Sequence, residues 1–236
     1  MLITFDKITD LLFPPRCAIC DDIIPVHSEY LCKECADKVL YINEPFCLKC
    51  GKALYDDSEY CTDCRQRVHY FKQGMAIFDY ASISDSLYRF KNKGRYEYAK
   101  FYATEIMRKR GDFIRSINPQ CIIPVPIHKS RLKKRGYNQA EEIALEISKI
   151  SKIPVISDLV CRSKKTNPLR KLNINERHKN LHNAFEINRK TKGLRRVLII
   201  DDIYTTGSTI DAMTKVLNRE GINEVYFITV TIGRGI

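Results

Sequence analysis

Four Cys-x-x-Cys pairs between residues 17 and 64 constrain the fold more than any other feature of this sequence. They are Cys17/Cys20, Cys32/Cys35, Cys47/Cys50 and Cys61/Cys64. Paired cysteines at this spacing favour a metal site over disulfides in a chain that is expected to reside in the cytosol. Zinc suits four thiolates, because it takes tetrahedral sulfur ligands and has no redox chemistry of its own. The sequence therefore predicts two structural Zn²⁺ sites, with an iron–sulfur cluster as the alternative metal centre.

An internal repeat indicates which pairs share a metal, since all gaps between successive pairs are ten or eleven residues long. Residues 17–35 (CAICDDIIPVHSEYLCKEC) resemble residues 47–64 (CLKCGKALYDDSEYCTDC), and both carry Ser-Glu-Tyr just before the second pair. We expect each copy to close its own site, with a cross-braced pairing as the alternative. One site would then hold Cys17, Cys20, Cys32 and Cys35, and the other Cys47, Cys50, Cys61 and Cys64. His27 can also bind zinc, but four thiolates already fill each site.

Two further cysteines and the N-terminal segment carry no sign of chemistry. Cys121 and Cys161 stand alone in apolar, strand-like surroundings and are expected to be buried small side chains. Residues 1–15 (MLITFDKITDLLFPP) are apolar in patches, but charges interrupt them and no cleavage site follows. We expect a short amphipathic segment there. No segment reaches the about 20 uninterrupted apolar residues of a membrane span, so a cytoplasmic protein is expected.

The net charge of +12 is unevenly distributed along the chain. Residues 1–70 hold 8 Lys and Arg against 12 Asp and Glu, and residues 71–236 hold the other 32 against 16. A basic body beside an acidic metal-binding module favours a polyanionic partner, either a phosphorylated small molecule or a nucleic acid.

The composition changes near residue 70, which predicts a double zinc-ribbon module over 1–70 and an α/β domain over 71–236. Strands are expected at 74–80, 120–127, 153–162, 185–188, 195–201 and 223–232. Helices are expected at 84–110 with a break at Gly94, at 136–151, and at 208–220 before Gly221. Strand–helix alternation of this kind implies a doubly wound, mostly parallel sheet. The polar stretch 162–183 lacks a clear period and is expected to be a functional loop or disordered.

The stretch VLIIDDIYTTGST (197–209) places two acids at the end of an apolar strand and a hydroxyl-rich loop before a helix. The loop consists of Thr205, Thr206, Gly207, Ser208 and Thr209. Its N–H groups, its hydroxyls and the helix dipole suit a dianionic phosphate. Asp201 and Asp202 would repel that anion and need hydroxyl donors or a cation instead. A ribose 5-phosphate offers both partners; the alternative is an exposed strand end followed by an ordinary helix cap.

Several motifs resemble those of known families. VLIIDDIYTTGST resembles the phosphoribosyl-pyrophosphate (PRPP) signature of type I phosphoribosyltransferases. PVP followed by HKSRLKKRGYNQAEEIA resembles the pyrophosphate loop and next helix of the ComF family, the late-competence ComFC-type proteins. A double zinc ribbon entered through LLFPPRCAIC, and the stretch ERHKNLHNAF (176–185), are also typical of that family. The resemblance covers almost the whole chain.

The resemblance implies a type I phosphoribosyltransferase fold that binds PRPP with Mg²⁺. In such enzymes an acceptor displaces pyrophosphate from C1. Asp201 and Asp202 would hold the ribose, and residues 205–209 the 5′-phosphate. The turn that presents backbone to pyrophosphate would consist of Val125, Pro126 and Ile127. Its charge partners would be Arg131, Lys134 and Arg135.

The resemblance also assigns larger segments. Residues of about 75–115 would form a hood that selects the acceptor, and about 116–236 the core of the domain. The loop 162–183 would cover the reacting groups and exclude water. Leu169 stands where many family members carry glutamine, which is a departure within that loop.

Two activities of related transferases are not expected. Thr205 stands where purine-base transferases carry an acid that assists the acceptor nitrogen, so hypoxanthine- or guanine-type activity is not predicted. Amidotransfer from glutamine needs a glutaminase domain with an N-terminal cysteine, whereas this chain begins with Met1.

Two functions of different classes remain. The first is a phosphoribosyltransferase with an unidentified acceptor. The second, which the ComF resemblance implies, is a binding protein for incoming single-stranded DNA that works with a helicase-like partner and other DNA-processing proteins. Basic clusters at 129–135 and 162–171, with Tyr96, Tyr98 and Tyr137 nearby, suit either polyanion.

Overall fold

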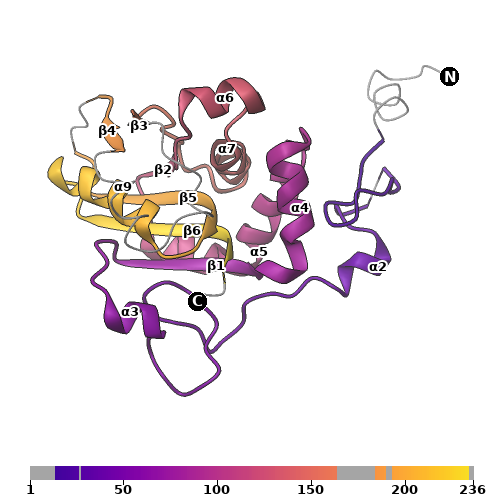
Figure 1. Cartoon of the computed structure of the whole chain (residues 1–236), viewed down its shortest axis with the longest axis horizontal. Coiled ribbons are helices and arrows are strands. Elements are labelled where there is room, and N and C mark those ends of the chain that lie inside the picture. Colours follow the sequence, from indigo (N-terminus) through magenta and orange to yellow (C-terminus); the bar gives the residue numbers. More distant parts are fainter. Residues whose placement is uncertain (1–13, 27, 164–183, 190–192, 234–236) are drawn as a thin grey trace.

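The computed structural model describes residues 14–26, 28–163, 184–189 and 193–233 (Figure 1). Parts of several expectations lie outside these residues. They are the segment 1–13, His27, positions 164–183 of the long loop with Leu169, and most of the stretch 176–185.

A four-stranded parallel sheet forms the centre of the molecule, in the order β1-β6-β5-β2. Its strands are β1 (Gln73–Asp79), β6 (Glu224–Ile232), β5 (Arg196–Tyr204) and β2 (Cys121–Pro124). Register pairs such as Ile123↔Ile199 and Ile200↔Ile228 align the apolar runs of neighbouring strands. The runs are continuous because both faces of the sheet are covered, as is usual for parallel sheets.

One face of the sheet is covered by three helices (Figure 1). They are α4 (Tyr80–Asn92), α5 (Tyr98–Ile117) and α7 (Gln139–Ser151). Side chains alternate across a strand, so Leu198 and Ile200 of β5 face these helices while Val197 and Ile199 face the other side. Helix α4 starts where Asp79 accepts a hydrogen bond from the N–H of Ala81 at 2.8 Å, and Gly94 lies in the gap before α5.

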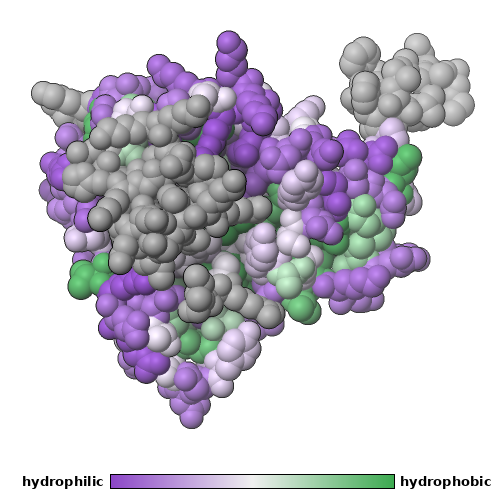
Figure 2. Space-filling model, viewed as in Figure 1, coloured by the Kyte–Doolittle hydropathy of each residue, from purple (hydrophilic) through white to green (hydrophobic). Residues whose placement is uncertain are grey.

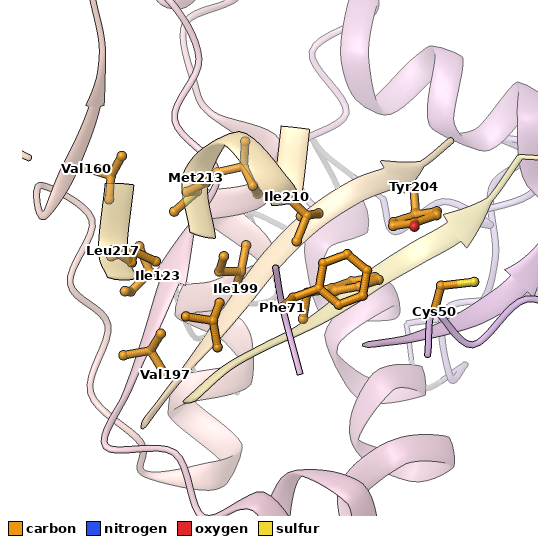
Figure 3. Packing of buried hydrophobic residues seen from close by; sticks show 14 of the residues in the cluster. Cys50, Phe71, Ile123, Val160, Val197, Ile199, Tyr204, Ile210, Met213 and Leu217 are labelled. Atoms are coloured by element: carbon orange, nitrogen blue, oxygen red, sulfur yellow. The ribbon is translucent and has the colours of Figure 1, made fainter. Parts of the chain in front are cut away.

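The opposite face is covered by α9 (Ser208–Arg219) and by the second cysteine-rich segment. Figure 3 shows Ile210, Met213 and Leu217 of α9 on the same side of the sheet as Phe71 and Cys50. With helices on both faces, the architecture is the doubly wound, mostly parallel α/β fold that the sequence predicts. The domain boundary near residue 70 stays a prediction.

In the described residues of the N-terminal part there are two short helices, α2 (Lys33–Ala36) and α3 (Thr62–Gln66), each directly after a cysteine that serves as its N-cap. Figure 1 shows α2 and α3 at separate places, α2 near the α4–α5 side and α3 below β1. Among the described residues, no helix has both the length and the apolar character of a membrane span.

Only the beginning of the expected strand 153–162 pairs with the parallel sheet, and neither its end nor 185–188 joins it. Strand β3 (Val160–Arg162) pairs antiparallel with β4 (Phe185–Ile187) in a separate two-stranded sheet. Upstream, Val155 makes only an isolated bridge to Ile122 at the edge of the main sheet. Pro154 can accept but cannot donate a ladder hydrogen bond, which limits pairing there.

A further helix, α6 (Lys129–Arg135), was not expected from the sequence. Its residues, KSRLKKR, have no apolar face and therefore no helical periodicity. The side chain of His128 caps its start by accepting from the N–H of Ser130 at 3.2 Å. Of the two isolated cysteines, Cys121 is buried as expected, whereas Cys161 is only partly buried.

Candidate functional site

The eight paired cysteines form two compact groups, and in each group the ligand atoms lie within 4.8 Å of one another. The groups are Cys17, Cys20, Cys32, Cys35 and Cys47, Cys50, Cys61, Cys64. Sulfur atoms lie 3.8 Å apart in Cys20–Cys32 and also in Cys50–Cys61. Four ligands at about 2.3 Å from a tetrahedral zinc ion are separated by about 3.8 Å, so both groups fit Zn²⁺. The sequential pairing predicted from the repeat is confirmed, and the cross-braced alternative is wrong.

The second group lies against the sheet. Gly51, the residue after Cys50, has φ +76, and a Cβ there would lie 2.7 Å from Cα of Met75 in β1. Only glycine permits both this backbone conformation and this close approach. The backbone of Lys49 also accepts a hydrogen bond from the N–H of Gly74 at 2.9 Å. The second zinc ribbon is therefore joined directly to β1.

A cleft of about 820 Å³ lies at the carboxyl ends of β5 and β2. It is lined by every residue that the sequence assigned to ligand binding: Val125, Pro126, Ile127, Arg131, Lys134, Arg135, Asp201, Asp202, Thr205, Thr206, Gly207, Ser208 and Thr209. Parallel strands end at one edge of a sheet, and ligands bind there because loops and helix N-termini meet at that edge. The structure thus brings the two predicted halves of the site together.

The two adjacent acids have different surroundings. Asp201 accepts a hydrogen bond from the N–H of Asp202 at 2.9 Å. The carboxylate of Asp202 forms an ion pair with Lys91 of α4 at 2.7 Å. Burial, followed by repulsion from Asp202, raises the pKa of Asp201 to about 7. Near neutral pH the Asp201 carboxyl can therefore donate as well as accept a hydrogen bond.

The loop 205–209 leads into the N-terminus of α9. Gly207 is its N-cap, with φ +76, and the N–H of Asp211 donates to the carbonyl of Gly207 at 2.8 Å. The hydroxyls of Thr206 and Ser208 lie 2.8 Å apart. The N–H groups of the first turn of a helix have no acceptor within the helix, and together with the helix dipole they make such a loop suitable for a phosphate. We call residues 205–209 the anion loop.

Basic side chains line the rest of the cleft: Lys91, Arg131, Lys134, Arg135 and Arg162. Arg162 is buried, and its guanidinium lies 5.3 Å from the ring centroid of Phe185. Burial and repulsion from Arg131 lower the pKa of Arg162 to about 10, although attraction to Asp201 acts to raise it. The cations outnumber the two acids, so the cleft favours an anionic ligand.

Some residues of the cleft were missed by sequence reasoning. Lys91, Tyr88 and Asn92 come from α4, far from the motifs in the chain, and no local pattern marks them. Asn138 carries a usable signal, because it precedes AEEIA and is an N-cap residue type. Its side chain accepts from the N–H of Ala140 at 3.3 Å and donates to the carbonyl of Val125 at 3.1 Å. It thereby links α7 to the turn 125–127.

Comparison with known proteins identifies the N-terminal part and relatives of nearly the whole chain. Residues 8–65 match the family described as "Double zinc ribbon domain". Competence protein F of Haemophilus influenzae is 30% identical over 216 residues, which cover 89% of this chain and 93% of that protein. DNA utilization protein YhgH of Escherichia coli K12 is 26% identical over 216 residues, covering 89% and 94%. Competence protein ComFC of Bacillus subtilis is 25% identical over 207 residues, covering 82% and 80%.

Two solved phosphoribosyltransferase structures align with part of this chain. Hypoxanthine phosphoribosyltransferase of Trypanosoma cruzi aligns with a TM-score of 0.38 and 11% identity, over 58% of this chain and 74% of that one. Adenine phosphoribosyltransferase of Thermoanaerobacter pseudethanolicus aligns with a TM-score of 0.29 and 16% identity, over 55% and 84%.

Proposed function

This chain belongs to the ComF family, that of competence protein F, and on this premise we propose that its cleft binds PRPP together with Mg²⁺. One observation supports the proposal above all others. A pair of partly buried acids, the anion loop and five basic side chains line a single cleft. This arrangement suits a molecule that has two anionic ends and a diol in the middle.

Each part of PRPP has a partner in the cleft. The anion loop would hold the 5′-phosphate, which alone carries about −1.5 to −2 charge at pH 7. Asp201 and Asp202 would accept hydrogen bonds from the 2′- and 3′-hydroxyls. The turn 125–127 would present backbone to the pyrophosphate, whose charge would be balanced by Arg131, Lys134 and Arg135.

Magnesium fits the same donor set. Mg²⁺ in proteins is commonly held by one or two carboxylates together with phosphate oxygens of the substrate. Here Asp201 and Asp202 offer the carboxylates, and pyrophosphate would offer the remaining oxygens. The metal would neutralise charge on the pyrophosphate and thereby make it a better leaving group.

Thr205 offers a hydroxyl and no carboxylate to an acceptor. We also propose a cytoplasmic location. The cysteines of the two zinc sites form no disulfide bonds, and free cysteines persist in a reducing compartment.

A second candidate function is binding of single-stranded DNA, with the transferase fold as its scaffold. The names of the relatives, which refer to competence and to DNA utilization, favour it. Exposed Tyr88 and Tyr96 and the basic α6 offer stacking and phosphate contacts. Tyr98, which was also expected to stack, is buried and donates a hydrogen bond to Asp21, so it is not available to a base. A helicase-like protein and other DNA-processing proteins would be the partners of this function.

Titration calorimetry with PRPP and MgCl₂ tests the first function, and fluorescence anisotropy with labelled single-stranded DNA tests the second. We expect Asp202→Asn to abolish PRPP binding and to leave DNA binding nearly intact. DNA affinity should fall steeply with salt, whereas PRPP affinity should fall less. Asp112→Asn, which alters an exposed carboxylate on α5, is the matched control. Undiminished PRPP affinity in Asp202→Asn would refute the assignment, and equal loss of both ligands would indicate one shared site.

A further inference from the structure

His69 is a buried histidine that lies between the second zinc ribbon and β1 and does not line the cleft. Its Nδ1 lies 2.8 Å from a carboxylate oxygen of Asp211 in the first turn of α9. A carboxylate can only accept, so Nδ1 carries the proton of this hydrogen bond. The other oxygen of Asp211 accepts from the N–H of Tyr70 at 2.9 Å. His69 and Tyr70, two consecutive residues between the second zinc ribbon and β1, therefore hold the start of α9 through Asp211.

The ring of His69 also touches the backbone of the anion loop. A Cβ added to Gly207 would lie 3.0 Å from Cε1 of His69 and 2.6 Å from the hydroxyl of Tyr204. Only glycine can approach these two rings so closely with φ +76. Contact with His69 and Tyr204 therefore defines the position of Gly207. It also fixes the direction of the neighbouring N–H groups.

His69 is itself held by aromatic packing that reaches the second zinc site. Its ring stacks on Phe71 with centroids 4.9 Å apart, and Phe71 meets Phe227 edge-on at 4.8 Å. Figure 3 shows Phe71 packed between Ile199, Tyr204 and α9. Lys49, which stands between the zinc ligands Cys47 and Cys50, lies over the Phe71 ring and donates to the carbonyl of Phe71. A continuous set of contacts thus joins this zinc ribbon to the anion loop.

We infer that His69 is a positioning residue of the anion loop: by joining the second zinc ribbon to Asp211 and Gly207, it aims the N–H groups of residues 205–209 at a phosphomonoester. That the ligand of the loop is a phosphomonoester rests on the proposed function. The loop geometry that the inference explains does not depend on which phosphate compound binds.

Two substitutions separate the hydrogen bond from the ring. His69→Phe keeps an aromatic ring and loses the donor to Asp211. His69→Asn places an amide N–H near the position of Nδ1 and retains the donor. Tyr102→Phe is the control: Tyr102 lies in α5, which contributes no residue to the cleft, and the substitution removes a buried hydrogen bond to Ser86 of α4 on the face of the sheet opposite to His69.

Affinities for ribose 5-phosphate and for inorganic pyrophosphate, both with Mg²⁺, are measured by calorimetry on the zinc-loaded full chain. We expect His69→Phe to weaken ribose 5-phosphate binding about tenfold, as loss of a hydrogen bond to a charged group implies. Pyrophosphate binding should change less than about twofold, because the groups that His69 meets, Asp211, Phe71 and Gly207, belong to other segments than the turn 125–127 and α6. His69→Asn and Tyr102→Phe should both stay close to the wild type.

Hydrogen exchange of the peptide 204–210 is followed in the same variants, together with zinc content. We expect faster exchange in His69→Phe, unchanged exchange in Tyr102→Phe, and full zinc loading in both. Unchanged exchange in His69→Phe, equal loss of both ligands, or loss of zinc would each overturn the inference. If the wild type binds neither ribose 5-phosphate nor PRPP, the proposed function fails, and the exchange result alone decides whether His69 positions the loop.

Discussion

The first zinc ribbon contacts α4 and α5 through the turn around Asp21 and through Ala18, which is buried together with both helices, whereas the second ribbon lies in the core on the other face of the sheet. In that turn Asp21 pairs with Arg95 at 2.8 Å and accepts from the hydroxyl of Tyr98 at 2.6 Å. Three other buried residues of the first ribbon, Cys17, Ile24 and Cys35, form a small cluster of their own. Figure 2 shows apolar surface over this ribbon at the right of the view.

The second ribbon has the same ligand set but a different environment. Cys47, Cys50 and Cys61 belong to the same buried cluster as residues of β5, β6 and α9. Identical metal chemistry therefore has different consequences, because what a site stabilises depends on what is packed against it. The first ribbon holds the α4–α5 connection, and so the Lys91 side of the cleft. The second supports the side that carries the anion loop.

Loss of one thiolate from each site tests this difference most directly, and it should produce the largest effect. Structural zinc contributes on the order of 10–16 kcal/mol of apparent binding free energy, about as much as the entire stability of a domain. We expect Cys50→Ser to abolish cooperative unfolding of the sheet. Cys20→Ser should lose zinc but keep a folded sheet. Zinc content and thermal unfolding followed by circular dichroism measure both. Equal damage from the two substitutions would contradict the comparison.

The stability of Asp201→Asn at several pH values tests the acid at the end of β5, on the side of the cleft that carries the anion loop. The pKa of Asp201 is raised to about 7, above the ordinary value of about 3.9. Its contribution to stability is therefore complete below pH 4 and is lost as pH rises through about 7. The wild type should lose on the order of 1–3 kcal/mol of unfolding free energy between pH 5.5 and 8, and Asp201→Asn should not.

Urea denaturation at several pH values measures this effect. Asp112→Asn, in which an exposed carboxylate is changed, should follow the wild type at every pH. A pH profile that is the same in Asp201→Asn and in the wild type would show that this acid is not the titrating group.

Removal of the Asp21 carboxylate tests how the first ribbon is attached to α4 and α5. Burial alone would raise the pKa of Asp21, but hydrogen bonds from Arg95 and Tyr98 outweigh it and hold that pKa below its ordinary range. Asp21→Asn should cost about 1–3 kcal/mol, the usual range for a hydrogen bond to a charged group. Faster hydrogen exchange in the α4–α5 connection, without change in 204–210, is the expected local result. Asp37→Asn, on the same ribbon and exposed, is the control.

The smallest effect is expected from Lys91→Met, which keeps most of the apolar stem and removes the charge paired with Asp202. PRPP affinity should fall roughly fivefold, which corresponds to about 1 kcal/mol. The pKa of Asp201 should rise further, because Lys91 opposes its shift. Calorimetry compares this variant with Lys100→Met, whose lysine is exposed on α5. Unchanged affinity would show that the side of the cleft held by the first ribbon does not take part in binding.

Much of the site was predictable because its chemistry is concentrated in short stretches. The anion loop and its two acids lie within nine residues, and the repeat around Ser-Glu-Tyr specified the zinc pairing. Other features had no such signal. Helix α6 lacks an apolar face, and β3 was placed in the wrong sheet because an apolar run does not reveal its partner strand.

The sequence by itself determined the ligands of both zinc sites, the apolar strands of the parallel sheet and the acids at the end of β5, because each is encoded by neighbouring residues of one type or period. Only the tertiary structure decided that Lys91 faces Asp202 and that His69 meets Asp211 and Gly207. Those contacts join residues more than a hundred positions apart. Packing of the ribbons and helices on the two faces of the sheet creates them, and no local pattern records it.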